Sequence, residues 1–138
     1  MIIDKESFLD VLREPTVLVA FNLRHWDAFL PMVNQIDMLP NLVARLDAAG
    51  RSDSLPERVA IHLEAARLRS RKQRRVVYWE VEQLESTLAS IDIPIVLLKG
   101  AAYLFRSLDT SHGRVYSDID LMVPKAWGSY RVFRPHQR

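Results

Sequence analysis

Residues 93–123 decide the fold of this chain, and they read IPIVLLKGAAYLFRSLDTSHGRVYSDIDLMV. The run at residues 93–98 is apolar and rich in β-branched side chains, a pattern typical of a strand that is covered on both faces. Lys99 and Gly100 follow this run and end it, because glycine commonly marks a turn. The sequence therefore predicts a buried strand that stops at a turn.

The remainder of this stretch predicts one helix and one further strand. Residues 101–108 have a helical pattern, and residues 109–113 have the composition of a turn. Residues 117–123 alternate between polar and apolar side chains up to Pro124, as a strand with one covered face does. A strand, a helix and a second strand are therefore expected in succession.

Helical signals dominate the sequence before this stretch. Pro15 closes a first helix, since proline disfavours helical geometry in the residue before it. Pro40 fits the first turn of a third helix, and Gly50 fits its C-terminal end. The three short helices are expected at residues 4–12, 23–37 and 41–49.

A fourth and much longer helix is expected to begin at an N-cap, Ser54, and to continue to Ile91. Apolar side chains recur along it at three-to-four spacing, and the cations between Arg67 and Arg75 lie off this apolar line. Helices at residues 4–91 followed by a strand, a helix and a second strand make the expected fold class α+β. The apolar stripe consists of Val59, Leu63, Ala66, Val77, Val81, Leu84, Leu88 and Ile91.

The composition is that of one globular domain: 138 residues, 49% hydrophobic and 26% charged. No apolar run approaches the ~20 residues that cross a bilayer, so no membrane partner is expected. Cysteine is absent, which excludes disulfides, thiolate metal sites and thiol nucleophiles. A cytoplasmic protein is expected.

Asp118 and Asp120 are the first candidates for chemistry. Residues two apart in a strand project to the same side, so the two carboxylates would lie in parallel while Ile119 and Leu121 face the core. Neighbouring carboxylates repel, and a divalent cation commonly relieves this repulsion. Mg²⁺ prefers oxygen ligands, typically carboxylates completed by phosphates and water. The sequence therefore predicts a Mg²⁺ site, although an Asp-x-Asp pair alone is also common at solvated strand ends.

Lys99 and Gly100 are candidates for phosphate binding. A phosphate can approach free backbone N–H groups where glycine begins a helix, and Lys99 would add a positive charge. Either residue is also explained by an ordinary turn. Arg114 either binds phosphate or caps a loop, and Ser117 either hydrogen-bonds near the metal or only begins the strand.

Two motifs in this stretch, residues 95–102 and residues 113–123, resemble the uncharacterised nucleotidyltransferase family of the DNA polymerase beta superfamily. The upstream region, with Trp26 and the long helix, is similar to that family as well. The resemblance extends to Pro124. It implies N-terminal helices packed on a small mixed β-sheet.

The resemblance also implies a reaction, in which a nucleoside monophosphate moves from a nucleoside triphosphate to an unknown acceptor hydroxyl. Lys99 and Gly100 match the Gly-Ser or Gly-Gly turn on which the triphosphate rests. Asp118 and Asp120 match the first two metal carboxylates, which would hold two Mg²⁺ ions.

The family takes a third carboxylate from a later strand, whereas this sequence has no Asp or Glu after Asp120. The expectation is a sheet that is incomplete and a chain that is truncated at its C-terminus, in which case transfer activity would be lost. The expected organisation is a helical region at residues 1–91, a nucleotidyltransferase core fragment at 92–124 and a basic irregular tail at 125–138.

Two further functions stay open. One is a non-catalytic module that binds nucleotide or nucleic acid through the run from Arg67 to Arg75, where six of nine residues are cations. A solvated helix face explains this run too, because no aromatic residues are interleaved with the cations. The other is a helical interaction protein that docks a partner, or a second copy, along the stripe from Val77 to Ile91.

Overall fold

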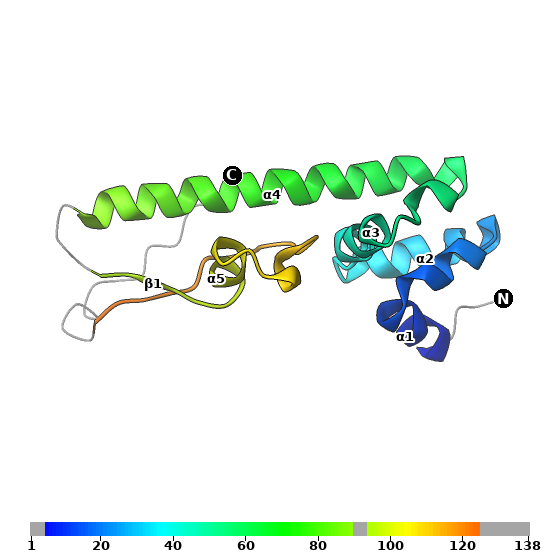
Figure 1. Cartoon of the computed structure of the whole chain (residues 1–138), viewed down its shortest axis with the longest axis horizontal. Coiled ribbons are helices and arrows are strands. Elements are labelled where there is room, and N and C mark those ends of the chain that lie inside the picture. The colour runs from blue at the N-terminus through cyan, green and yellow to red at the C-terminus, as the bar shows by residue number, and fades with distance from the viewer. Residues whose placement is uncertain (1–4, 90–93, 125–138) are drawn as a thin grey trace.

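The computed structural model describes residues 5–89 and 94–124. One long helix, α4, runs along the whole molecule, with three short helices beside one half of it and the small sheet and α5 beside the other half (Figure 1). Three 3-10 helices, η1 to η3, connect these elements. The bounds are α1 Lys5–Arg13, η1 Pro15–Ala20, α2 Leu23–Gln35, α3 Leu39–Ala48, η2 Ser52–Ser54, α4 Glu57–Ala89, β1 Val96–Leu97, α5 Lys99–Phe105, η3 Asp109–Ser111 and β2 Leu121–Met122.

The three N-terminal helices agree with the sequence pattern. Asn22 caps α2, because its side-chain oxygen accepts a hydrogen bond from the His25 backbone N–H at 3.0 Å. Pro40 occupies the first turn of α3 as expected, and Gly50 after its end has the positive φ of 64° that favours glycine. The apolar run that begins after Pro15 forms η1 together with Pro15 itself.

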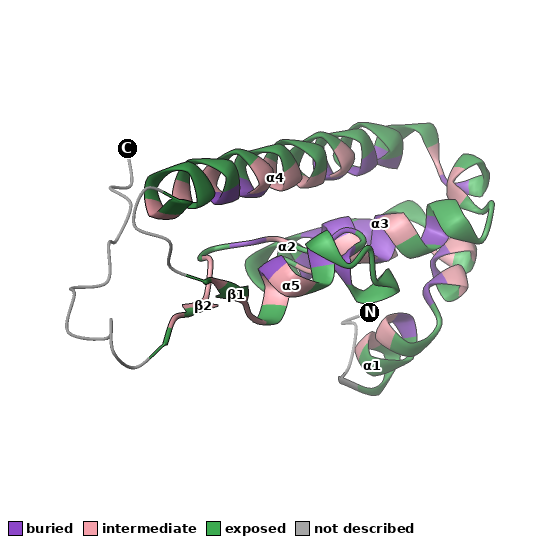
Figure 2. Cartoon of the chain, turned by 60° about the vertical axis from the view of Figure 1, so that its left-hand side comes forward, coloured by how far each residue is buried: buried purple, intermediate pink, exposed green. Residues whose placement is uncertain are grey.

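A first hydrophobic cluster joins η1, α1, α2 and α3 to the N-terminal half of α4. Its centre is aromatic, since the rings of Trp26 and Phe29 lie edge to face with their centroids 5.8 Å apart and Phe21 contacts both. Figure 2 shows that much of α3 is buried and that α3 lies in the layer next to α4. The buried members are Val11, Leu18, Trp26, Phe29, Leu30, Val33, Leu39, Leu42, Val43, Leu46, Leu55, Val59, Leu63 and Ala66.

The long helix begins later than the sequence suggested. Ser54 is not its N-cap, because Ser52–Ser54 form η2 and Leu55 is extended; α4 begins at Glu57. An ion pair joins α3 to α4, with Arg67 Nη2 2.6 Å from Asp47 Oδ1. Five members of the apolar stripe of α4 are buried as expected, namely Val59, Leu63, Ala66, Val77 and Val81. Leu84 and Leu88 are half-buried, and the last member, Ile91, lies outside the described residues.

A second, smaller cluster lies under the C-terminal half of α4. It consists of Val77 and Val81 of α4, Ala101 and Leu104 of α5, and Tyr116. Leu97 of β1 and Ile119 pack against it. The helix α4 therefore contributes to both clusters, with Val59, Leu63 and Ala66 in the first and Val77 and Val81 in the second.

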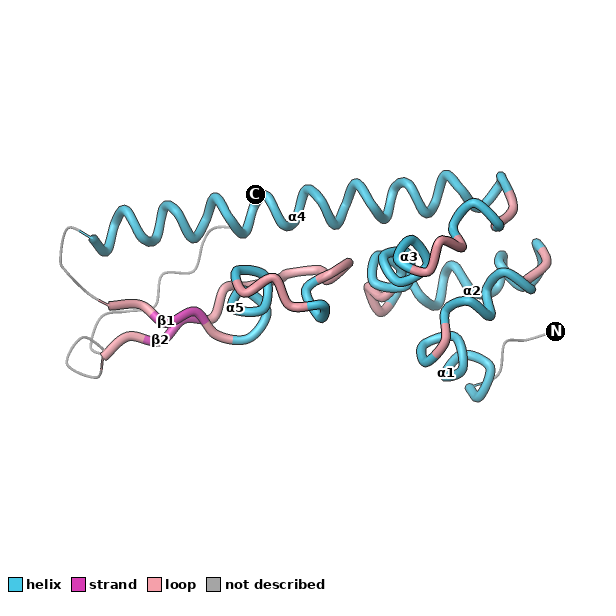
Figure 3. The backbone as a smooth tube through the Cα atoms, in the orientation of Figure 1, coloured by secondary structure: helices cyan, strands magenta, loops and turns pink. Residues whose placement is uncertain are grey.

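The sheet is smaller than the sequence indicated. Within the described residues it has two antiparallel strands, β1 and β2, paired at Val96 with Met122 and at Leu97 with Leu121 (Figure 3). The expected strands at 93–98 and 117–123 are therefore reduced to two residues each, and no mixed sheet is present in this part of the chain. Val96 is half exposed, so β1 is not covered on both faces. The ladder is short because only one face meets apolar side chains.

The fold class agrees with α+β, being mostly helical with a small sheet. The helices that cover the sheet are α4 and α5 rather than the N-terminal α1 to α3, which pack in the first cluster. None of the helices in the described part of the chain has the length and apolar character needed to cross a membrane.

Candidate functional site

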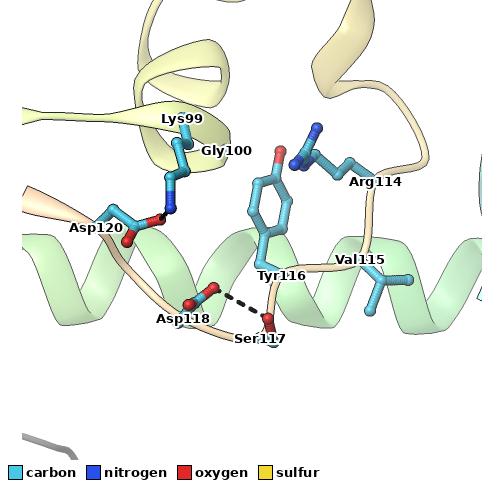
Figure 4. A pocket seen from close by; sticks show the side chains of 8 residues that line it. All are labelled: Lys99, Gly100, Arg114, Val115, Tyr116, Ser117, Asp118 and Asp120. Carbon is cyan, nitrogen blue, oxygen red and sulfur yellow. Dashed lines mark hydrogen bonds and ion pairs between the residues drawn. The ribbon is translucent and has the colours of Figure 1, made fainter.

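All six residues that the sequence singled out line one pocket (Figure 4). The pocket lies beside the second cluster, between the start of α5 and the segment that leads into β2. Two segments of the chain therefore meet there, although their residues are up to 21 positions apart in the sequence. The lining residues are Lys99, Gly100, Arg114, Val115, Tyr116, Ser117, Asp118 and Asp120.

Asp120 is positioned by the strand pairing. The Leu98 backbone N–H donates a hydrogen bond to the Asp120 carbonyl oxygen at 2.9 Å, which extends the pairing of β1 and β2 by one step. Lys99 follows with a positive φ of 48° and begins α5 instead of ending the strand. Its Nζ lies 3.0 Å from Asp120 Oδ2, so the ammonium group that was expected to meet phosphate forms an ion pair with a metal-ligand candidate.

Asp118 lies on the same extended segment, two residues earlier. This segment precedes β2, because the strand begins only at Leu121 and Ser117 does not start it. Ser117 Oγ donates a hydrogen bond to Asp118 Oδ1 at 3.0 Å, which orients that carboxylate. Ile119 between the two carboxylates turns toward the second cluster, so the alternation expected from the sequence is present without a regular strand.

Gly100 allows the first turn of α5 to approach the pocket wall closely. A Cβ atom at this position would lie 3.2 Å from Arg114 Nε and 3.3 Å from Tyr116 Cδ1, both closer than ordinary contacts. The Arg114 guanidinium lies over the ring of Tyr103, 5.7 Å from its centroid, in a cation–π contact. The Arg114 guanidinium therefore has a defined position at the pocket wall.

Two residues of this region were missed by the sequence reasoning. The Tyr116 backbone N–H donates a hydrogen bond to Gln73 Oε1 at 2.8 Å. This bond ties to α4 the segment at residues 114–120, which we call the pocket loop. Burial raises the pKa of Tyr116, whose hydroxyl donates to the Ser111 carbonyl oxygen at 3.3 Å. A signal for Gln73 did exist, because a polar side chain within a buried stripe needs a hydrogen-bond partner.

The pocket has the donor chemistry that a metal–nucleotide complex requires. Two carboxylates supply oxygen ligands of the kind Mg²⁺ prefers, and the Arg114 and Tyr116 side chains occupy the space that a Cβ atom at Gly100 would need. Lys99 and Arg114 balance the two negative charges. No third acidic or metal-binding side chain joins the pair among the residues that the structure describes.

A carboxylate pair beside a glycine turn and two cations is typical of proteins that handle nucleotides, and the function of this chain is nucleotidyltransferase-like in general terms. The chain belongs to the uncharacterised nucleotidyltransferase family, whose sequence profile matches residues 22–128. The match confirms the resemblance at the level of the family. No significant match was found among curated proteins or among solved structures.

Proposed function

We propose that this protein binds a nucleoside triphosphate with Mg²⁺ and transfers its nucleoside monophosphate to an acceptor hydroxyl, as in the DNA polymerase beta superfamily. The acceptor oxygen forms a bond to the α-phosphorus, the bond from that phosphorus to pyrophosphate breaks, and the acceptor proton passes to solvent. The observation that carries the proposal is the convergence of Lys99, Gly100, Asp118 and Asp120 on one pocket in a chain of this family.

In this proposal Asp118 and Asp120 hold Mg²⁺. The resemblance to the family implies two Mg²⁺ ions at this position. Mg²⁺ bound there would neutralise charge on the phosphates and on the leaving pyrophosphate. Ser117 keeps Asp118 oriented through its hydrogen bond. These roles use the two carboxylates in the positions where the structure places them, at the open side of the pocket.

Lys99 has two partners in succession. Without ligand its ammonium group neutralises Asp120 at 3.0 Å. A cation held by Asp120 would compete with this ion pair, and the ammonium group of Lys99 would then pair with the triphosphate. Arg114 supplies a second cation at the rim, and the missing side chain at Gly100 leaves room for Arg114 against the first turn of α5.

A second candidate function is nucleotide binding without transfer. It is favoured by the absence of a third metal ligand beside Asp118 and Asp120 within residues 5–89 and 94–124. Transfer needs both metal positions, whereas binding of one Mg²⁺–triphosphate complex needs only one or two carboxylates. Both functions therefore predict binding of the triphosphate, and only the first predicts turnover.

The test measures binding and turnover separately. Each of the four ribonucleoside triphosphates is titrated into the chain by calorimetry with and without Mg²⁺, and transfer is followed with an α-phosphate label. We expect Mg²⁺-dependent binding that falls at least tenfold in Asp118→Asn and Asp120→Asn. Asp109→Asn is the matched control, because this exposed carboxylate does not line the pocket.

Lys99→Ala tests the second role of the ammonium group. We expect about tenfold weaker triphosphate binding with little change for the free nucleoside, because the lost charge acts on phosphate. Binding without label transfer would establish the second candidate. Equal binding by wild type, Asp118→Asn and Asp120→Asn would disprove both functions.

A further inference from the structure

A second line of side chains runs along α4, on the side opposite to its buried stripe. Ile61, Leu68, Lys72, Arg75 and Trp79 are spaced by seven, four, three and four residues, so they share one face of the helix. Val77 is two residues from both Arg75 and Trp79, about 200° around the helix, and it is buried. We call the face of Ile61, Leu68, Lys72, Arg75 and Trp79, with the adjacent Arg71 and Val76, the outer face.

The outer face carries large apolar side chains in solvent. The exposed fractions are 72% for Ile61, 56% for Leu68, 43% for Val76 and 60% for Trp79. Single exposed apolar residues are normal on protein surfaces, whereas a spaced line of them with cations between is typical of a helix-binding surface. A shallow groove follows this line, formed by Leu68, Arg71, Lys72, Arg75, Val76 and Trp79.

The charge of the outer face is one-sided. No Asp or Glu occurs from Ala65 to Trp79, while six cations do. Three of these cations already have carboxylate partners: Arg67 pairs with Asp47, Arg69 with Asp37 and Arg71 with Glu64. Lys72 and Arg75 project into the groove and form no ion pair within the described residues.

We propose that the outer face of α4 docks an amphipathic helix of a partner protein that carries acidic residues beside its apolar stripe. The apolar anchors of the outer face, from Ile61 to Trp79, span 19 residues, about 27 Å of helix, which suits a partner helix of about five turns. Acidic side chains on that helix would pair with Lys72 and Arg75, which lie between the anchors Leu68 and Trp79.

Charge argues against this chain as its own partner. Two copies of α4 paired through their outer faces would bring Arg71, Lys72 and Arg75 of both copies together, and like charges at such distances repel. Residues 125–138 carry four cations and no acidic residue, so they are not complementary either. The negative charge that would complement the outer face must therefore come from neither a second outer face nor residues 125–138.

The apolar anchors argue against nucleic acid. Phosphate groups pair with cations, but they offer nothing to Ile61, Leu68 and Val76, and single strands are held by several stacked aromatic rings. Trp79 is the one aromatic residue on the outer face. The face also lies away from the nucleotide pocket, since the bond from Tyr116 to Gln73 reaches α4 on its inner side.

Designed peptides test the proposal on the full chain. Three 25-residue helical peptides carry the same apolar stripe, flanked by Glu, by Ser or by Lys, and their binding is measured by fluorescence anisotropy at low and high salt. We expect the Glu peptide to bind at least tenfold more tightly than the Lys peptide, and less tightly at high salt. Leu68→Ser and Trp79→Ser should each weaken its binding about tenfold or more.

A charge reversal distinguishes this docking from nonspecific hydrophobic binding. The double variant Lys72→Glu, Arg75→Glu should prefer the Lys peptide, whereas Arg106→Glu, at an exposed cation after α5, should keep the wild-type preference. Ile36→Ser controls for the loss of an exposed apolar residue elsewhere. Circular dichroism checks that each variant is folded.

Three results would overturn the proposal. One is equal or absent binding of the Glu and Lys peptides. Another is binding of single-stranded RNA or anionic vesicles, lost in the Lys72→Glu, Arg75→Glu variant, when the Glu peptide does not bind. The third is a dimer in sedimentation experiments that Leu68→Ser dissociates.

Discussion

The two hydrophobic clusters of this molecule differ in size and in what they support. Among the described residues the first has fourteen buried members, including an aromatic centre, while the second has five. The candidate pocket lies on the second cluster, and the first has no sequence-predicted site residue in it. The comparison indicates that α1 to α3 stabilise α4, and that α4 in turn holds the pocket loop in place.

The largest effect is expected from Trp26→Ala. Removing this buried indole from the aromatic centre should cost about 3–5 kcal/mol, and the whole molecule should lose stability because α4 depends on the first cluster. Urea unfolding followed by circular dichroism measures this cost. Trp79→Ala is the control, since its side chain is 60% exposed and the substitution should cost under about 0.5 kcal/mol. Similar urea midpoints for both variants would show that the first cluster is not the main source of stability.

Leu104→Ala should have a smaller and more local effect. Leu104 is fully buried in the second cluster, and we expect a cost of about 2 kcal/mol, near the lower end of the range, because a small cluster collapses more easily. Hydrogen exchange should increase in α5 and in the pocket loop, and it should stay unchanged in α2. Faster exchange in α2 as well as in α5 and the pocket loop would mean that the two clusters unfold as one unit.

Gln73→Ala removes the bond from α4 to the pocket loop. The Tyr116 N–H loses its acceptor, which should cost about 1 kcal/mol and weaken triphosphate binding, because the loop carries the carboxylates. Gln73→Glu retains an acceptor oxygen and should restore binding. Gln83→Ala, at an exposed position of the same helix, should have no effect on binding. If Gln73→Ala bound triphosphate as wild type does, the bond would have no positioning role.

The smallest effect is expected from Asp47→Asn, which removes the ion pair between α3 and α4. The hydrogen bond from Arg67 lowers the pKa of Asp47 below its ordinary value of 3.8. A carboxylate with a lowered folded-state pKa adds stability above its unfolded pKa and loses it as the pH falls through the folded value. The pair is partly exposed, so we expect at most about 1 kcal/mol at neutral pH.

Urea midpoints of wild type and Asp47→Asn should therefore differ between pH 5 and 7 and converge below about pH 4. Added salt should also reduce the difference, since exposed charges are screened. A difference that does not shrink as the pH falls below the ordinary pKa of an aspartate would mean that the side chain acts through packing or through its contact with Ser52 and not through its charge.

The sequence predicted the parts of the structure that depend on local patterns. Helical spacing located α2 to α4, and the alternation around Ile119 and the turn at Gly100 identified residues that share a pocket. It did not predict the bond between Gln73 and Tyr116, because the two residues are 43 positions apart and nothing local to either indicates the other. The strands were overestimated since β propensity measures a fit to a covered surface, and none of residues 94–98 and 117–123 is fully buried.

Lys99 takes a backbone conformation that usually belongs to glycine, with a φ of 48°. Such a conformation costs a residue with a side chain on the order of 1 kcal/mol or more. The backbone is therefore strained at the same residue whose ammonium group reaches Asp120. Stability and charge placement oppose each other at this residue, so a sequence selected for stability alone would not keep a lysine there.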